Sequence, residues 1–226
     1  MQAAKLVITA ASMSLATVLA QPADAAGSHD PQKHTHASVV VAAAVADQTK
    51  VNATKAALRD LWIGHVFWVR NVVVAGLAGD AAAQQTAEKQ VVGNAQSIAG
   101  SIEPFYGAKA KEKLFALLAG HYGAVKAYLD ASIAKDAGKQ SEATTKLMSN
   151  AGEIASFLST ANPYLPKDTV EELFQEHGGH HMTEIQQLQA RDFAGEAQTW
   201  ADMTQHMYVI ADALAGAIAK QFPAKF

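Results

Sequence analysis

The chain has 226 residues, of which 50% are hydrophobic, with a formal net charge of −3 and no cysteine. A charge this close to zero gives no electrostatic basis for binding nucleic acid or an anionic membrane surface. Without thiolates, any metal site must use histidine, carboxylate or methionine ligands.

The first 25 residues have the pattern of a secretory signal peptide. Lys5 precedes an apolar run, and the segment ADA at residues 23–25 supplies the small residues that signal peptidase requires. We expect cleavage after Ala25 and a periplasmic or extracellular mature protein. No later stretch reaches the roughly 18 uninterrupted apolar residues of a spanning helix, so the sequence predicts that the mature protein does not span a membrane.

Residues 26–50 are predicted to form a flexible tether before a folded domain at residues 51–226. The tether is rich in polar residues and contains His29, His34 and His36. A flexible histidine-containing tract can capture metal, although a solvated linker is the simpler interpretation.

From residue 51 onward, apolar residues recur at three- and four-residue spacing, which is typical of helices, and no strand pattern competes. Turn residues interrupt this pattern at regular intervals. Six helices are predicted, at residues 52–78, 81–102, 108–135, 140–160, 167–189 and 194–221. The expected fold class is therefore all-α, an antiparallel six-helix bundle.

A 56-residue repeat runs through the helical region. His65, His121 and His177 follow one another at this interval, each with matching apolar neighbours. The intervening helices keep the same shift, with Asn94 and Asn150 in step. We interpret this pattern as an internal duplication of a helical hairpin.

The repeat predicts a layer of histidines in the bundle. Helices that carry His65, His121 and His177 are each separated by one antiparallel partner, so they run in the same direction. His206 lies about 20 Å after the turn that precedes the last helix, as His177 lies about 20 Å before that turn. We therefore expect these four histidines at one height.

Apolar residues one helical turn away predict that all four histidines face the core. A buried imidazole without a partner costs on the order of 1–3 kcal/mol, so something must satisfy them. Gly64 and Gly120 directly precede two of these histidines, and Gly178 and Gly179 follow a third. A mid-helix glycine costs about 1 kcal/mol relative to alanine, which indicates that a backbone or a ligand approaches closely there.

The layer predicts a transition-metal site, because neutral imidazole is a common ligand of zinc, copper and iron. His181 shares a helix face with His177, and methionines lie near it and near His206. The predicted ligands are His65, His121, His177, His206, His181 and Met203. The thioethers favour copper slightly over zinc or iron, and haem between paired histidines stays open although no feature selects it.

Other interpretations also remain open. A metal-free layer could bond to carbonyls and to nearby acids, set the packing register or sense acid pH; these acids are Asp60, Asp202, Glu176 and Glu184. An enzyme of unknown reaction is the third possibility, but the chain has no phosphate loop or nucleophile elbow. If the hairpins stack as an open array, successive histidines lie more than about 10 Å apart, so only a closed bundle makes one shared site.

Several stretches resemble an uncharacterised family of helical proteins from bacteria and archaea. These stretches are LRDLWIGHVFWVRNVVV, IEPFYG, LFALLAGH, IASFLSTANP and HMYVIADALAGAIAKQFPAKF. The matching positions include His65, Trp68, Arg70, Tyr106, His121, His177, His206 and Asp212.

The resemblance implies a helical fold and little biochemistry. Some members carry a glycosyltransferase label, but this chain has no nucleotide-binding pattern that would support it. Members often have an acidic residue before the first two histidines, where this chain has Gly64 and Gly120. If those acids orient the histidines, the resemblance implies a weaker or different site here.

Overall fold

The part of the chain that the computed structural model describes, residues 45–226, is built from helices, which confirms the all-α class. The predicted signal peptide and the tether as far as residue 44, with its three histidines, lie outside the described residues. The long helices are α1 (Gln48–Ala78), α2 (Ala81–Ser101), α4 (Ala108–Ile133), α5 (Ala137–Ala161), α6 (Lys167–Ala190) and α7 (Phe193–Gln221). The single turn α3 (Glu103–Tyr106) precedes α4, and a 3-10 turn (Pro223–Lys225) follows α7.

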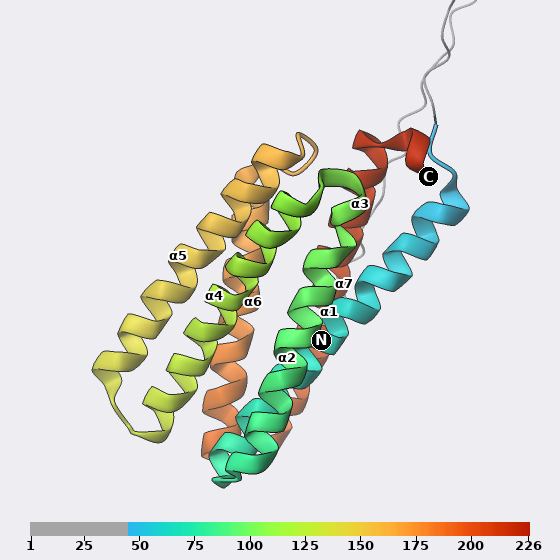
Figure 1. The fold of residues 1–226 in the computed structure, drawn as a ribbon. Helices are drawn as coiled ribbons and strands as arrows, with labels where there is room; N and C mark the ends of the chain where they lie inside the picture. The colour runs from blue at the N-terminus through green and yellow to red at the C-terminus, as the bar shows by residue number, and fades with distance from the viewer. Residues whose placement is uncertain (1–44) are drawn as a thin grey trace, which may run out of the picture. The chain divides into compact units, whose positions relative to one another are not determined.

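Successive long helices run antiparallel and form three hairpins, α1/α2, α4/α5 and α6/α7 (Figure 1). The last helix, α7, packs against both α6 and α1, so the bundle is closed. In its centre, α1, α4 and α6 contact one another, and these are the helices that carry the repeated histidines. An open array of hairpins is therefore excluded for the described residues.

Aspartate side chains cap the N-terminal ends of four long helices, which is why the predicted breaks occur where they do. The capping residues are Asp47, Asp80, Asp136 and Asp192, and each accepts a hydrogen bond from a backbone N–H in the first helical turn. Gly79 ends α1 in the left-handed conformation (φ 72°), where the absence of a side chain avoids steric strain. Local turn chemistry thus sets the hairpin boundaries.

Most helix ends lie within two residues of the predicted ones, but α5 begins at Ala137 rather than residue 140, and two further differences have a clear local cause. Helix α1 begins at Gln48, three residues before the predicted start of the domain, because Asp47 supplies an N-cap there. The segment around Pro104, predicted to be only a turn, forms the one-turn helix α3, since proline suits the first turn of a helix.

Helix α1 is rich in apolar residues. Among residues 45–226, it is the one helix long and apolar enough to cross a membrane. Core helices of soluble proteins share this property, and 39% of its most apolar window is buried inside the bundle. The expectation about membrane spanning therefore stays a prediction.

The interior contains two large apolar clusters, one on each side of the histidine layer. The first includes Leu58, Trp62 and Phe174, and the second includes Val69 and Ile185. Along α6, His177 and His181 lie in sequence between Phe174 of the first cluster and Ile185 of the second, and on α1 His65 lies at the boundary between the two. The layer is therefore a polar island inside an otherwise apolar core.

Candidate metal centre

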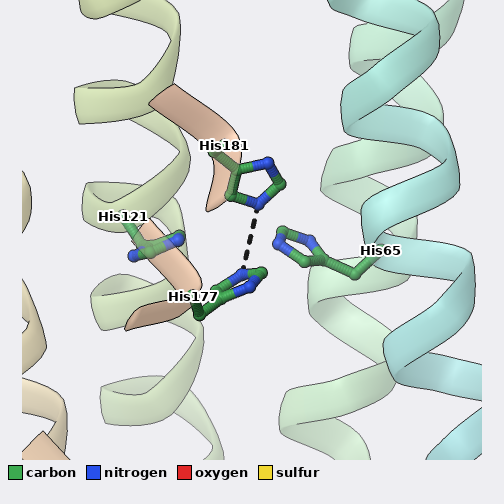
Figure 2. A group of neighbouring side chains, drawn as sticks. All are labelled: His65, His121, His177 and His181. Atoms are coloured by element: carbon green, nitrogen blue, oxygen red, sulfur yellow. Dashed lines mark hydrogen bonds between the residues drawn. The ribbon is translucent and has the colours of Figure 1, made fainter. Parts of the chain in front are cut away.

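Four histidines from three helices converge in the middle of the bundle (Figure 2). His65 comes from α1, His121 from α4, and His177 and His181 from α6. One ring nitrogen of each lies within 4.8 Å of one from every other. The most exposed of the four retains only 4% of its accessible surface. We call these four residues the histidine cluster.

The closest pair in the histidine cluster comes from a single helix. His177 and His181 are four residues apart on α6 and their rings meet edge-on. Their Nε2 atoms are 3.2 Å apart, and without a metal one of them donates a hydrogen bond to the other (Figure 2). Two nitrogens bound to one tetrahedral ion at about 2.0–2.1 Å would be separated by about 3.3 Å. The spacing therefore suits two ligands of one metal ion.

Most ring nitrogens of the cluster have no hydrogen-bond partner within the described residues. These buried atoms are Nε2 of His65, both ring nitrogens of His121, and Nδ1 of His177 and of His181. Each unsatisfied buried polar group costs about 1–3 kcal/mol. A bound cation would accept one lone pair from each ring, and so would pair the free Nε2 of His65 and one ring nitrogen of His121, while the Nδ1 atoms of His177 and His181 would stay without a partner. The donor set of four imidazoles therefore fits a metal ion, although the ion would satisfy only part of the unpaired nitrogens.

Burial keeps the cluster uncharged. Loss of hydration lowers the pKa of His121 and of His181 to about 3, and lowers the pKa of His65 and His177 well below 6.5. Repulsion between the rings adds to this effect at His65, His121 and His177. Neutral imidazole is the form that donates a lone pair to a metal. The four imidazoles are therefore already neutral and need not lose a proton before they bind a metal ion.

A buried carboxyl group lies behind one of the rings. Glu184, one turn after His181 on α6, is fully buried, and its Oε2 is 4.0 Å from Nδ1 of His181. Burial raises the pKa of Glu184 to about 8, opposed by the positive charge of Arg70, whose Nε is 3.6 Å from Glu184 Oε1. Arg70 also donates a hydrogen bond of 2.6 Å to Glu196. At 4.0 Å the contact with His181 is longer than a hydrogen bond. Carboxylates that do bond to a metal-binding histidine commonly orient its ring.

Two of the predicted ligands have other surroundings. His206 on α7 lies beside the cluster, with its ring centre 6.4 Å from that of His177. Its Nε2 donates to the carbonyl oxygen of Leu173 at 2.8 Å, and its Nδ1 faces Glu176 Oε2 at 3.5 Å. Met203 is fully buried in the first apolar cluster, where packing accounts for it.

The bond made by His206 has counterparts in the other two hairpins. Asn94 on α2 donates to the carbonyl oxygen of Leu61 at 2.9 Å, and Asn150 on α5 donates to that of Leu117 at 3.1 Å. All three carbonyls lie four residues before a repeated histidine, and each donor lies 33 residues after its acceptor. These contacts follow the 56-residue period, while the internal duplication itself stays a prediction.

The glycines beside the histidines have a steric cause. A Cβ atom on Gly64 would lie 2.9 Å from Nδ2 of Asn94, and one on Gly120 would lie 3.1 Å from Nδ2 of Asn150. The group that approaches these glycines is thus a side-chain amide rather than the backbone or ligand expected from the sequence. Near Gly179, by contrast, an added Cβ would meet no atom within 4 Å.

The α6/α7 hairpin has ionisable residues at several positions where the other two hairpins have none. Its distinctive residues are Glu176, His180, His181, Glu184 and His206. The residues 56 and 112 positions before Glu176 are both glycine, those before His181 are both valine, and those before His206 are both asparagine. The corresponding residues are alanine and tryptophan for His180, and tyrosine and valine for Glu184. The third hairpin therefore replaces mainly apolar or small residues with ionisable ones.

Sequence reasoning did not recognise the pairing of Arg70 with Glu184 and Glu196. The available signal was the position of both glutamates on core-facing stretches of α6 and α7, where only 0% and 5% of their surface is exposed. A buried carboxylate is rare unless it is paired, so each should have prompted a search for a basic partner.

The fold and the site define a closed all-α bundle with a buried histidine cluster. Comparison of the chain with protein-family models, with curated proteins and with solved structures finds no match. The resemblance to the helical family from bacteria and archaea thus stays a prediction, and the functional argument depends on the geometry of the site.

Proposed function

We propose that this protein binds one transition-metal ion through the histidine cluster. The observation that supports the proposal is the convergence of four buried neutral imidazoles, whose ligand atoms lie within 4.8 Å of one another. In a metal-free protein, the unpaired ring nitrogens lose their hydration without gaining a partner, at a cost of about 1–3 kcal/mol for each unsatisfied group. A metal ion bound by one nitrogen of each ring offsets this cost at His65 and at one nitrogen of His121.

Zinc, copper and iron are the candidate ions, because all of them accept imidazole ligands. The structure does not strengthen the expectation that methionine thioethers favour copper, because Met203 and Met207 are fully buried members of the first apolar cluster. The 3.2 Å separation of the two α6 nitrogens suits a tetrahedral ion such as zinc.

Four protein ligands complete a tetrahedral coordination sphere, so the site resembles closed structural sites more than catalytic sites, which keep one position for water or substrate. All four members of the cluster are also buried. Together with the predicted signal peptide, these features support a protein that holds a metal ion outside the cytoplasm rather than an enzyme.

The decisive experiment compares the untagged full-length protein with His181→Val. Valine stands at the corresponding positions of the other hairpins, Val69 and Val125, so the variant should fold. We expect near-stoichiometric metal by elemental analysis after incubation with zinc, copper or iron salts. The variant should retain less than a tenth of this metal at equilibrium after dialysis against a weak chelator.

His180→Ala is the matched control, because it removes a neighbouring histidine from the same helix while leaving the cluster intact. It should bind as much metal as the unchanged protein at equilibrium. The tether histidines stay in all three proteins, so any metal that they hold appears equally in each. Equal metal content in the unchanged protein and His181→Val would contradict the proposal.

A further inference from the structure

We propose that Arg70 closes the route by which a metal ion enters and leaves the histidine cluster, and that Glu184 and Glu196 line this route. The inference rests on the proposed function, because an entry route matters only if the cluster binds metal. We call these three residues the arginine gate.

The histidine cluster has no direct access to solvent, since each of its four members has at most 4% of its surface exposed. The two large apolar clusters lie on either side of it along the bundle. A cation that moved in these directions would exchange its hydration for hydrocarbon groups, which carries a large cost in free energy. A route through polar groups on the flank of the bundle is therefore favoured.

A continuous series of polar contacts runs from the cluster to the surface on this flank. Nδ1 of His181 is 4.0 Å from Oε2 of Glu184, and Oε1 of Glu184 is 3.6 Å from Nε of Arg70. Among the described residues, His181 is the one cluster member with an acidic side chain within 4.0 Å. Side-chain exposure rises from 1% at Glu184 to 36% at Arg70. The series thus leads from the buried rings to solvent.

The carboxyl group of Glu184 is available to a passing ion. Neither of its oxygens has a hydrogen-bond partner among the described residues, although the side chain is almost fully buried. Carboxyl oxygens are ligands of zinc in many proteins. An ion beside Glu184 could therefore keep an oxygen ligand while it exchanges water for the imidazoles of the cluster.

Arg70 blocks this route with both its volume and its charge. Its guanidinium group is always positively charged, so it repels an approaching cation. Nε of Arg70 donates a 2.6 Å hydrogen bond to Glu196, and the guanidinium carbon lies 5.7 Å from the centre of the Trp200 ring. A charge-assisted bond of this kind is stronger than a neutral one. An ion can therefore pass only when this bond breaks and the Arg70 side chain turns toward solvent.

A second arginine of α1 makes the same kinds of contact away from the cluster. Arg59 donates hydrogen bonds of 2.8 and 2.7 Å to Asp212 on α7, and its guanidinium carbon is 4.9 Å from the centre of the Tyr208 ring. Both arginines thus join α1 to α7 through a carboxylate and an aromatic ring. Of the two, Arg70 alone also faces Glu184, so joining the helices does not require the buried acid.

The test measures the rates at which Co²⁺, used as a spectroscopic probe, enters and leaves the full-length protein. The gate variant is Arg70→Gln with Glu196→Gln, which removes both members of the ion pair and leaves the net charge unchanged. The matched control is Arg59→Gln with Asp212→Asn, which removes the other ion pair between the same two helices. Stopped-flow absorbance measures entry into the metal-free protein, and transfer to an excess of chelator measures release.

We expect entry and release both to be at least about tenfold faster in the gate variant, because a hydrogen bond between charged groups no longer has to break first. A gate affects the path and not the bound state. The ratio of the two rates and the final amount of bound Co²⁺ should therefore change by less than about threefold. The control variant should load and release Co²⁺ at the rates of the unchanged protein.

Arg70→Lys is a milder second variant, which tests the gate even if the double variant does not fold. Lysine keeps the positive charge but lacks the planar guanidinium group that faces Glu196 and Trp200. It should accelerate entry and release by the same factor, about threefold or more. Circular dichroism of each variant confirms that the rates compare folded proteins.

Rates in the folded gate variants equal to those of the unchanged protein would overturn the gate and leave the proposed function intact. An equal acceleration in the control variant would do the same, because it would reflect general loosening of the contact between α1 and α7. Faster release with unchanged entry would also overturn the gate, since Arg70 and Glu196 would then stabilise the bound ion. If neither Co²⁺ nor Zn²⁺ binds to the unchanged protein, both the proposed function and the gate are wrong.

Discussion

The α1/α2 and α4/α5 hairpins differ from the α6/α7 hairpin at the same structural positions. In the first two, an asparagine amide reaches over a glycine to the carbonyl that lies one turn before the repeated histidine. In the third, His206 makes this bond opposite Glu176. The same backbone carbonyl therefore accepts its hydrogen bond from an asparagine opposite a glycine in two hairpins, and from a histidine opposite a glutamate in the third. Only the second pair adds ionisable groups.

The comparison shows how one helical framework accommodates a polar centre. The first two hairpins supply one histidine each to the cluster, and the third supplies two together with the adjacent Glu184. Because the first two hairpins supply only one histidine each, most of the core remains apolar. Burial of this apolar surface can offset the free-energy cost of burying the polar groups. Variants that exchange residues between hairpins therefore test each contribution separately.

The largest expected effect concerns acid stability and His181→Val. The pKa of His181 is about 3 in the folded protein and near 6.5 when unfolded, so the unfolded chain binds the proton first. Its contribution to stability is complete above pH 6.5 and is lost as the pH falls toward 3, by about 1.4 kcal/mol per pH unit.

Between pH 6.5 and 4.5, the metal-free protein should therefore lose about 2 kcal/mol more of its unfolding free energy than His181→Val loses. Urea unfolding with a chelator present, at several pH values, measures this difference. Glu184 acts in the opposite direction, because its raised pKa favours the folded state at low pH, but it is present in both proteins. Parallel pH profiles for the two proteins would contradict the assignment.

The next effect concerns Glu184→Gln, which alters a group that the other hairpins lack. With its pKa near 8, Glu184 is mostly protonated at neutral pH, so glutamine is a close substitute in the metal-free protein. Metal binding at His181 Nε2 puts the proton on Nδ1, which a carboxylate holds better than an amide. We expect metal affinity to fall about 10- to 100-fold, measured by chelator competition, with little change in the stability of the metal-free protein.

A smaller effect is expected from removal of the interhelical amides. Asn150→Ala and Asn94→Ala should each lower the unfolding free energy by about 1 kcal/mol, because each variant loses one hydrogen bond to a backbone carbonyl. The more buried Asn150 should have the larger effect of the two. Chemical denaturation measures both, and an unchanged stability in Asn150→Ala would show that the amide does not fix the helix pair.

The smallest effect separates two glycines that both lie near cluster histidines. Gly179→Ala should raise stability by up to about 1 kcal/mol, because alanine favours the helix and the added Cβ meets no neighbour within 4 Å. Gly64→Ala should not show this gain, since its Cβ would lie 2.9 Å from the amide of Asn94 and displace it. Equal gains in thermal unfolding for both variants would remove the steric explanation for Gly64.

Much of the fold could be predicted from the chain because helix formation depends on local signals. Apolar periodicity located the long helices, and capping aspartates such as Asp80 and Asp136 marked their boundaries within a few residues. The 56-residue spacing also indicated which histidines share a height. The short helix α3 was not predicted because a single turn has too few residues to show periodicity.

By itself, the sequence determined that the described chain is helical and that His65, His121, His177 and His206 face inward, because both properties follow from residue spacing along one helix. Only the tertiary structure decided which rings converge, since height along a bundle does not specify the direction of a side chain around each helix. His206 shares the layer, but its Nε2 is bound to Leu173 of the neighbouring helix. His181, one turn further along α6, points into the space where α1, α4 and α6 meet.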